Sequence, residues 1–181
     1  MVIGILQKKD NSLREYMEQH LTDDLKSLGY KSYSIIQVYG FNTLNQMKEK
    51  DLKENLRKEG IDKVLTIVLL DKKKERYFIS NKVSNQPYGI KTADFYSYYN
   101  STLNHINRSG YYATTTKYYW ESNMYDLNNP LLLYSVQTTS FNPASEQSLA
   151  HEYGRMIIND MVRHNLLSKP LVKSDKSIAA F

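Results

Sequence analysis

The sequence predicts an α/β fold in which helices pack on a single mixed β-sheet, and three observations support this class. The run Val64–Leu70 is almost continuously apolar, as expected of a strand that is covered on both faces. Residues 13–28 place apolar side chains at helical spacing, which predicts an amphipathic helix. The turn formers at 128–130 separate two β-rich segments, so they predict a long antiparallel hairpin in the C-terminal half.

The N-terminal half is expected to alternate between strands and helices. A β-branched run at 2–7 precedes Ser12 and Glu15, whose spacing is typical of a capping box that begins a helix over 12–28. Gly29 supplies the left-handed position after that helix. Apolar and charge patterns then predict a strand at 32–39, a charged helix at 43–59, the strand 64–70, a solvated turn at 72–76 and a strand at 77–79.

The C-terminal half is expected to form the hairpin and a last helix. Strands are predicted at 111–127 and 131–141, and the last helix at 143–164, capped by Asn142 or Ser145. The complete order is β-α-β-α-β-β-β-β-α. Alternation along the first hairpin strand puts Tyr118, Trp120, Ser122 and Met124 on one face and Tyr119, Glu121, Asn123 and Tyr125 on the other, so one face can pack on a helix and the other can meet solvent.

Length and composition indicate a single domain over 1–168, followed by a mobile tail at 169–181. A chain of 181 residues can bury enough surface to fold without disulfides or a structural metal. Because it contains no Cys, disulfide scaffolds, Cys-based zinc sites and thiol nucleophiles are excluded. Its 24 Lys and Arg against 19 Asp and Glu give a net charge of +5, which is weak evidence for a polyanionic partner.

Residues 81–112 form a Tyr-rich insertion, and its part 81–108 is expected to be a long irregular excursion because it is rich in loop formers. Tyrosine combines a large rigid ring with a hydroxyl group, so it suits the recognition of a sugar, a peptide or another protein. The alternative is that these rings fill space between the loop and the sheet. The candidate binding residues are Tyr88, Tyr96, Tyr98, Tyr99, Tyr111, Tyr112 and Tyr119.

No motif in the sequence specifies a catalytic or cofactor site. The pair His151-Glu152 lacks the second His of a helical zinc motif, because Arg155 stands at that position. The seven Gly residues form no phosphate-binding loop, and a Gly-x-Ser-x-Gly elbow is absent. We therefore expect no catalytic residues, no metal and no cofactor. If the protein is instead a hydrolase, Glu121 and Asp126 are the candidate carboxylates.

The hairpin sequence resembles that of small α/β domains in bacterial envelope lipoproteins. The residues that carry the resemblance are Trp120–Leu127, the turn at 128–130 and the returning strand Leu131–Thr138. This pattern is similar to the amino-terminal domain of TolB and to the curli-secretion lipoprotein. The terminal segment Leu149–Gly154 also resembles secreted or lipid-anchored proteins of Bacteroidetes-type bacteria. These families imply no catalytic residues, and the insertion at 81–112 departs from the shorter TolB-like pattern.

Together these observations favour a non-enzymatic envelope domain that binds a protein or glycan through the Tyr-rich loop and hairpin surface. The alternative is a hydrolase acting on envelope polysaccharide or peptidoglycan. The resemblance implies a periplasmic or outer-membrane-anchored location, with membrane attachment only through a lipid anchor upstream of Met1. Nucleic acid is not an expected partner, because the basic run at 72–76 has no second basic run to support it.

Overall fold

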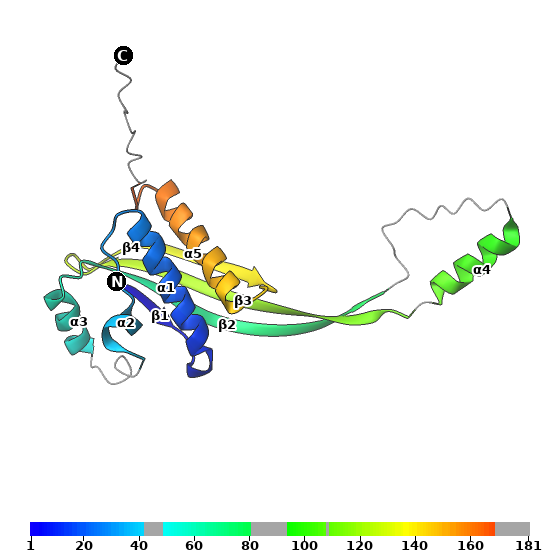
Figure 1. Cartoon of the computed structure of the whole chain (residues 1–181), viewed down its shortest axis with the longest axis horizontal. Coiled ribbons are helices and arrows are strands. Elements are labelled where there is room, and N and C mark those ends of the chain that lie inside the picture. The colour runs from blue at the N-terminus through cyan, green and yellow to red at the C-terminus, as the bar shows by residue number, and fades with distance from the viewer. Residues whose placement is uncertain (42–48, 81–93, 108, 169–181) are drawn as a thin grey trace, which may run out of the picture. The chain divides into compact units, whose positions relative to one another are not determined.

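The computed structural model describes residues 1–41, 49–80, 94–107 and 109–168 (Figure 1). The chain divides into two compact units. Unit 1 comprises Met1–Lys72 together with Tyr118–Phe181, and unit 2 comprises Lys73–Lys117. The tail predicted at 169–181 lies outside the described residues, so its mobility and the boundary at 168 stay predictions.

The predicted fold class is confirmed: the protein is a mixed α/β structure built on one four-stranded sheet. The strands are β1 (Val2–Ile5), β2 (Lys63–Ile79), β3 (Tyr111–Asp126) and β4 (Leu131–Phe141), and they are arranged in the order β1-β2-β3-β4. The first two strands run parallel, with Val2 opposite Leu65. A short turn joins β3 to β4 and forms the predicted hairpin. Strands β2 and β3 each contribute residues to both units.

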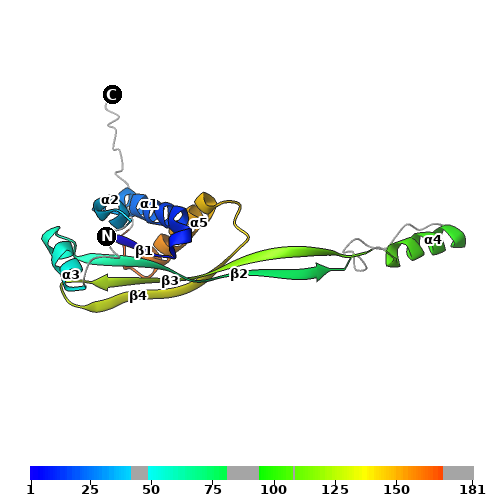
Figure 2. The ribbon, with the colours of Figure 1, turned by 90° about the horizontal axis from the view of Figure 1, so that it is seen from below.

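Four α-helices cover the part of the sheet that belongs to unit 1. In the chain, all four follow the short 3-10 helix η1 (Lys8–Asp10). They are α1 (Asn11–Ser27), α2 (Ile35–Tyr39), α3 (Glu49–Lys58) and α5 (Glu146–Arg163). Helices α1 and α5 lie side by side, as Figures 1 and 2 both show. A hydrophobic core joins these two helices to the sheet face that carries Val2, Leu65 and Trp120.

The alternation predicted for β3 is confirmed on the side of this core. Tyr118, Trp120, Ser122 and Met124 are all buried, and the Trp120 side chain is fully enclosed. The opposite face of the sheet presents Ile3 and Val64 to a smaller core, which includes Ile35 of α2 and Leu56 of α3. Both faces of β2 are therefore covered at its N-terminal end, which explains the continuous apolar run in that part of the sequence.

The predicted strand at 32–39 is wrong for most of its length, because Ile35–Tyr39 forms helix α2. Only Ser34 makes a β-bridge, to Val2. The Ser34 hydroxyl accepts a hydrogen bond from the backbone N–H of Gln37, so it caps the helix. The carboxylate of Glu18 accepts the backbone N–H of Ile36 at 3.1 Å. These polar partners stabilise the first helical turn despite its β-branched composition.

Two further local predictions are also corrected. The segment 72–76 is not a turn, since β2 continues through it to Ile79. Its charged side chains are exposed, so strand geometry imposes no burial cost on them. The predicted capping box fails as well, because the Ser12 hydroxyl donates a hydrogen bond to Glu146 on α5 at 2.6 Å. That contact between helices replaces the local one. At the other end of the chain, Ser145 caps α5 as predicted.

The irregular excursion predicted for 81–108 is wrong over Phe95–Ile106, which forms helix α4 in unit 2. Asp94 directly precedes this helix, and its carboxylate accepts hydrogen bonds from the backbone N–H and the hydroxyl of Ser97 at 2.9 and 2.8 Å. The N-cap interaction and the helical spacing of the aromatic residues outweigh the loop-forming Asn and Ser residues of this segment.

Candidate functional site

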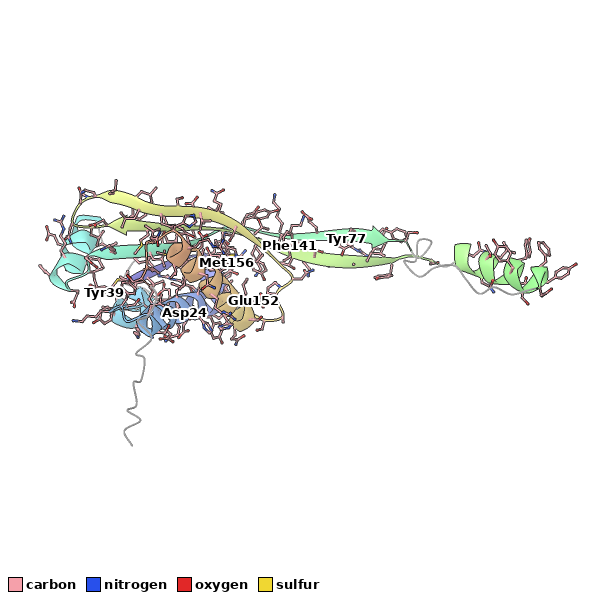
Figure 3. All side chains as sticks on the ribbon, turned by 90° about the horizontal axis from the view of Figure 1, so that it is seen from above. Asp24, Tyr39, Tyr77, Phe141, Glu152 and Met156 are labelled. Atoms are coloured by element: carbon pink, nitrogen blue, oxygen red, sulfur yellow. The ribbon has the colours of Figure 1, made fainter. Side chains whose placement is uncertain are left out.

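Unit 2 exposes a set of large aromatic side chains, which we call the aromatic surface. Its members are Tyr77, Phe78, Phe95, Tyr96, Tyr98, Tyr99, Tyr111 and Tyr112. The most exposed is Tyr96, at 72%, and the least exposed is Tyr77, at 48%. Tyr77 is labelled in Figure 3. Rings of this size are normally packed inside a domain, so eight exposed rings in one short unit indicate a contact surface.

Helix α4 carries four of these rings in an ordered arrangement. The carboxylate of Asp94 holds the first turn, and its hydrogen bonds to Ser97 and Tyr96 lower the pKa of Asp94 below its usual value. The rings of Phe95 and Tyr99 stack with their centroids 6.0 Å apart, as residues at i and i+4 on one helix face do. Phe95 also meets Tyr96 edge to face at 5.5 Å. The rings of Phe95, Tyr96 and Tyr99 are therefore held against one another before any partner binds.

The other four rings belong to a two-stranded ribbon formed by 73–79 of β2 and 111–117 of β3. The Arg76 guanidinium lies over the Tyr112 ring, 4.2 Å from its centroid, and Phe78 meets the same ring edge to face at 5.3 Å. The ammonium of Lys117 contacts the Glu75 carboxylate at 2.6 Å. The Arg76 guanidinium and the rings of Phe78 and Tyr112 thus lie together on the ribbon. Their edge-to-face and cation–π contacts order Tyr112.

A close backbone approach fixes the end of this ribbon. A Cβ atom at Gly110 would lie 2.3 Å from the Ile79 carbonyl oxygen and 2.3 Å from the Phe78 ring. Real Cβ atoms do not come so close, so only Gly fits there. The absence of a side chain at 110 is what lets Phe78 occupy its position in the aromatic surface.

The structure places five of the predicted binding residues in unit 2 and exposes them all: Tyr96, Tyr98, Tyr99, Tyr111 and Tyr112. Tyr119 belongs to unit 1, where it is half-buried on β3. Tyr88 lies outside the described residues. Sequence reasoning missed Tyr77, Phe78 and Phe95 as members of the surface. The available signal was the pair Tyr77-Phe78 in the predicted strand 77–79, directly after the charged run that was predicted to be a turn.

The carboxylates considered for hydrolysis do not form an acid–base pair. Glu121 accepts hydrogen bonds from Gln137 and Asn123, which lower its pKa, and Asp126 accepts the backbone N–H groups of Asn129 and Asn128, with the same effect. A general acid needs a raised pKa. The two residues are also five positions apart on β3, which corresponds to about 16 Å of strand, beyond the spacing that glycosidases use. Neither residue favours a hydrolase.

A cluster of polar side chains lies where helix α1 packs against helix α5. The rings of His20 and His151 are in contact, with centroids 5.5 Å apart, so the fold brings together two His residues that are distant in sequence. Beside them, burial raises the pKa of Asp24, and the two His residues oppose this shift. Asp24 is labelled in Figure 3. Among the described residues, no group of three His, Asp or Glu side chains is arranged to hold a metal ion.

Unit 1 also contains an apolar cavity of about 490 Å³. It lies between α3 and the turn end of the β3–β4 hairpin, where Leu52 and Leu56 face Leu127 and Leu131. Tyr125 and Asp126 are the polar side chains on its border. A pocket with so few polar groups suits an apolar occupant. It contains none of the predicted binding residues.

Comparison with known proteins gives a structural likeness and no family. No protein-family model matches the sequence, and no curated protein matches it. Within the part of the chain that the structure describes, no helix is long and apolar enough to cross a membrane. Among solved structures, the chain is similar to the crystal structure of lipoprotein GNA1162 from Neisseria meningitidis. The TM-score is 0.48 and the sequence identity 14%, over 90% of this chain and 97% of that chain.

Proposed function

We propose that this protein is a non-enzymatic binding protein of the bacterial cell envelope, and that it contacts a protein or glycan partner through the aromatic surface of unit 2. The observation that carries the proposal is the exposure of the eight aromatic rings. Each combines a large apolar area with few rotatable bonds, so little conformational entropy is lost when the ring is covered. Aromatic residues are also enriched where binding energy is concentrated in interfaces.

The ordered contacts within unit 2 support recognition over simple packing. Phe95 stacks on Tyr99, and Arg76 and Phe78 both contact Tyr112, so the rings are oriented although they stay exposed. Aromatic faces and Tyr hydroxyls suit both the apolar face of a sugar and the side chains of a protein. The envelope setting is the one implied by the resemblance of the hairpin sequence to envelope lipoproteins.

The test compares two variants of the aromatic surface with a matched control. One variant combines Tyr98→Ala and Tyr99→Ala on α4, and the other combines Tyr111→Ala and Tyr112→Ala on the ribbon. The control combines Tyr33→Ala and Tyr125→Ala, which removes two exposed rings from unit 1. The probes are purified peptidoglycan and detergent-solubilised envelope proteins, each incubated with the full chain and then recovered with it.

We expect the wild type and the control to retain a peptidoglycan or protein partner and at least one surface variant to lose it. Because the rings are exposed, the free energy of unfolding should change by no more than about 1 kcal/mol in each variant. A wild type that captures neither probe, or variants that capture as well as the control, would overturn the proposal. A large loss of stability in the surface variants would show that the rings belong to a core.

A further inference from the structure

Helix α4 has an apolar face that runs along its whole length. Phe95, Tyr98, Tyr99 and Leu103 follow one another at spacings of three, one and four residues, which places them on one side of the helix. The opposite side carries Ser97, Asn100, Ser101 and Asn104. Phe95, Tyr98 and Tyr99 are between half and two-thirds exposed. The helix is therefore amphipathic, and the rings of its apolar side face solvent.

The composition of this helix is unusual for one that faces water. Its 12 residues include no Lys, Arg, Asp or Glu. A solvated helix normally carries charges opposite its apolar face, as α3 does with its sequence EKDLKENLRK. Tyr and Phe, in contrast, are the residues whose rings lie well at the boundary between headgroups and acyl chains. The helix spans only about 18 Å, so it fits along a bilayer surface and not across the core of about 30 Å.

The charge of the chain is concentrated in the same unit. Residues 73–117 contain seven Lys and Arg against two Asp and Glu, so this unit carries a net charge of +5. The remainder of the chain has 17 basic and 17 acidic residues and is neutral. The described basic residues include Lys74 and Arg76, which are exposed on the ribbon. Basic residues in the same unit as an amphipathic helix add an attraction to anionic headgroups.

From these observations we infer that α4 lies in the surface of a membrane with anionic headgroups, with Phe95, Tyr98 and Tyr99 at the headgroup boundary. The inference rests on the proposed function, because it uses part of the same aromatic surface. It leaves the ribbon rings for the protein or glycan partner. It also adds to unit 2 a membrane contact that is independent of any lipid anchor.

The experiment is flotation of the full chain with two kinds of vesicle. One is made of zwitterionic phosphatidylcholine, and the other contains phosphatidylglycerol in addition. The helix variant combines Tyr98→Ala and Tyr99→Ala. The ribbon variant, Tyr111→Ala with Tyr112→Ala, is the matched control, since it removes the same two side chains from the same unit. A charge variant combines Lys73→Gln and Lys74→Gln. Far-ultraviolet circular dichroism checks the helix content of each variant.

We expect the wild type to float with the anionic vesicles and the helix variant to bind them at least tenfold more weakly. The ribbon variant should bind like the wild type. Each Lys removed should weaken binding about fivefold, and added salt should weaken it further. Absence of wild-type binding, equal binding by the helix variant, or equal binding to both kinds of vesicle would overturn the inference.

The two proposals fail in different ways. Capture of peptidoglycan or an envelope protein without flotation would overturn the membrane contact and leave the proposed function supported. Flotation that depends on Tyr98 and Tyr99, without capture of either probe, would support the membrane contact and overturn a protein or glycan partner. If the helix variant loses helix content, Tyr98→Phe with Tyr99→Phe provides the second test. That variant keeps the rings, so it should retain flotation.

Discussion

The carboxylate of Glu18 accepts a hydrogen bond from the backbone N–H of Gly4 at 2.8 Å and so ties helix α1 to strand β1. The same oxygen accepts Arg14 Nε at 3.0 Å, and the other oxygen accepts the Ser34 hydroxyl at 2.6 Å. The Glu18 side chain is fully buried. A Cβ atom at Gly4 would lie 2.7 Å from Arg14 Cγ, so Gly at this position makes the approach possible.

Removing the buried carboxylate should strongly destabilise unit 1. In Glu18→Ala the Arg14 guanidinium stays buried without its partner, and the N–H of Gly4 loses its acceptor. Breaking a buried ion pair of this kind costs about 3–5 kcal/mol. The measurement is urea unfolding followed by the fluorescence of Trp120, the single Trp of the chain. Asp23→Ala, on the exposed side of the same helix, is the control and should cost less than about 0.5 kcal/mol. Equal losses of stability in Glu18→Ala and Asp23→Ala would show that the buried carboxylate makes no special contribution to stability.

A substitution at Gly110 should disrupt the aromatic surface while leaving the unit 1 core folded. In Gly110→Ala the new Cβ would clash with the Ile79 carbonyl oxygen and with Phe78. Amide hydrogen exchange in 73–79 and 111–117 should therefore accelerate. The unfolding midpoint reported by Trp120, which is fully buried in unit 1, should stay close to that of the wild type. Unchanged exchange in the ribbon would contradict the prediction.

The buried hydroxyl pair of Ser122 and Tyr153, 2.8 Å apart, should govern part of the stability at alkaline pH. Burial raises the pKa of Tyr153 to about 12, from a usual value of 10.0. Its stabilising contribution is therefore complete below about pH 10 and is lost as the pH rises through 12.

Tyr153→Phe should reduce that alkaline loss, and it should cost about 1–3 kcal/mol near pH 7 because the Ser122 hydroxyl is left unpaired in the core. Urea unfolding at a series of pH values measures both effects. In the double variant with Ser122→Ala, the cost of the Tyr153 change should shrink, since the unpaired hydroxyl is gone. Strictly additive costs would show that the two hydroxyls do not interact.

Replacing Asp24 by Asn should stabilise the protein at neutral pH. Burial raises the pKa of Asp24, and its Oδ2 atom is buried without a hydrogen-bond partner among the described residues. The protonated form is thus favoured by folding, so the contribution of this group is present below its usual value of 3.8 and is lost as the pH rises through its raised pKa.

Asp24→Asn removes the buried charge and should raise the urea midpoint near pH 7. The advantage over the wild type should shrink in acid, as the pH falls through the raised pKa of Asp24 and Asp24 itself becomes protonated. Asp23→Asn, at the exposed neighbouring position, should leave the midpoint unchanged at both pH values. A lower midpoint for Asp24→Asn at neutral pH would contradict the burial argument.

The sequence was most informative where one physical signal dominated. The alternation along β3 correctly placed Tyr118, Trp120 and Ser122 on one face, which the structure shows to be buried, and the bounds of β4 were predicted without error. The helix at 35–39 was missed because its first turn depends on Glu18, a residue 17 positions before Ile35 in the sequence. Helix propensity is a property of the local sequence, so it cannot include the effect of a partner from another part of the chain.

The candidate site was predicted only in outline. Composition alone identified the Tyr-rich segment, and five of the predicted Tyr residues are exposed in unit 2. The contributions of Phe78 and Arg76 were missed, because they depend on strand β2 continuing past Lys72 to pair with β3. The contact of Arg76 with Tyr112 joins residues 36 positions apart in the sequence. A local pattern carries no signal for such a contact.

The position of α5 at the end of the described chain has a consequence for synthesis on the ribosome. This helix supplies Leu149, Tyr153, Ile157 and Met161 to the core that encloses Trp120. Until the last of these residues leaves the exit tunnel, the inner face of the sheet has no cover from α5. A nascent chain that stops before residue 161 therefore exposes the apolar face of these strands to chaperones and proteases, and the core of unit 1 is completed only after α5 has been synthesised.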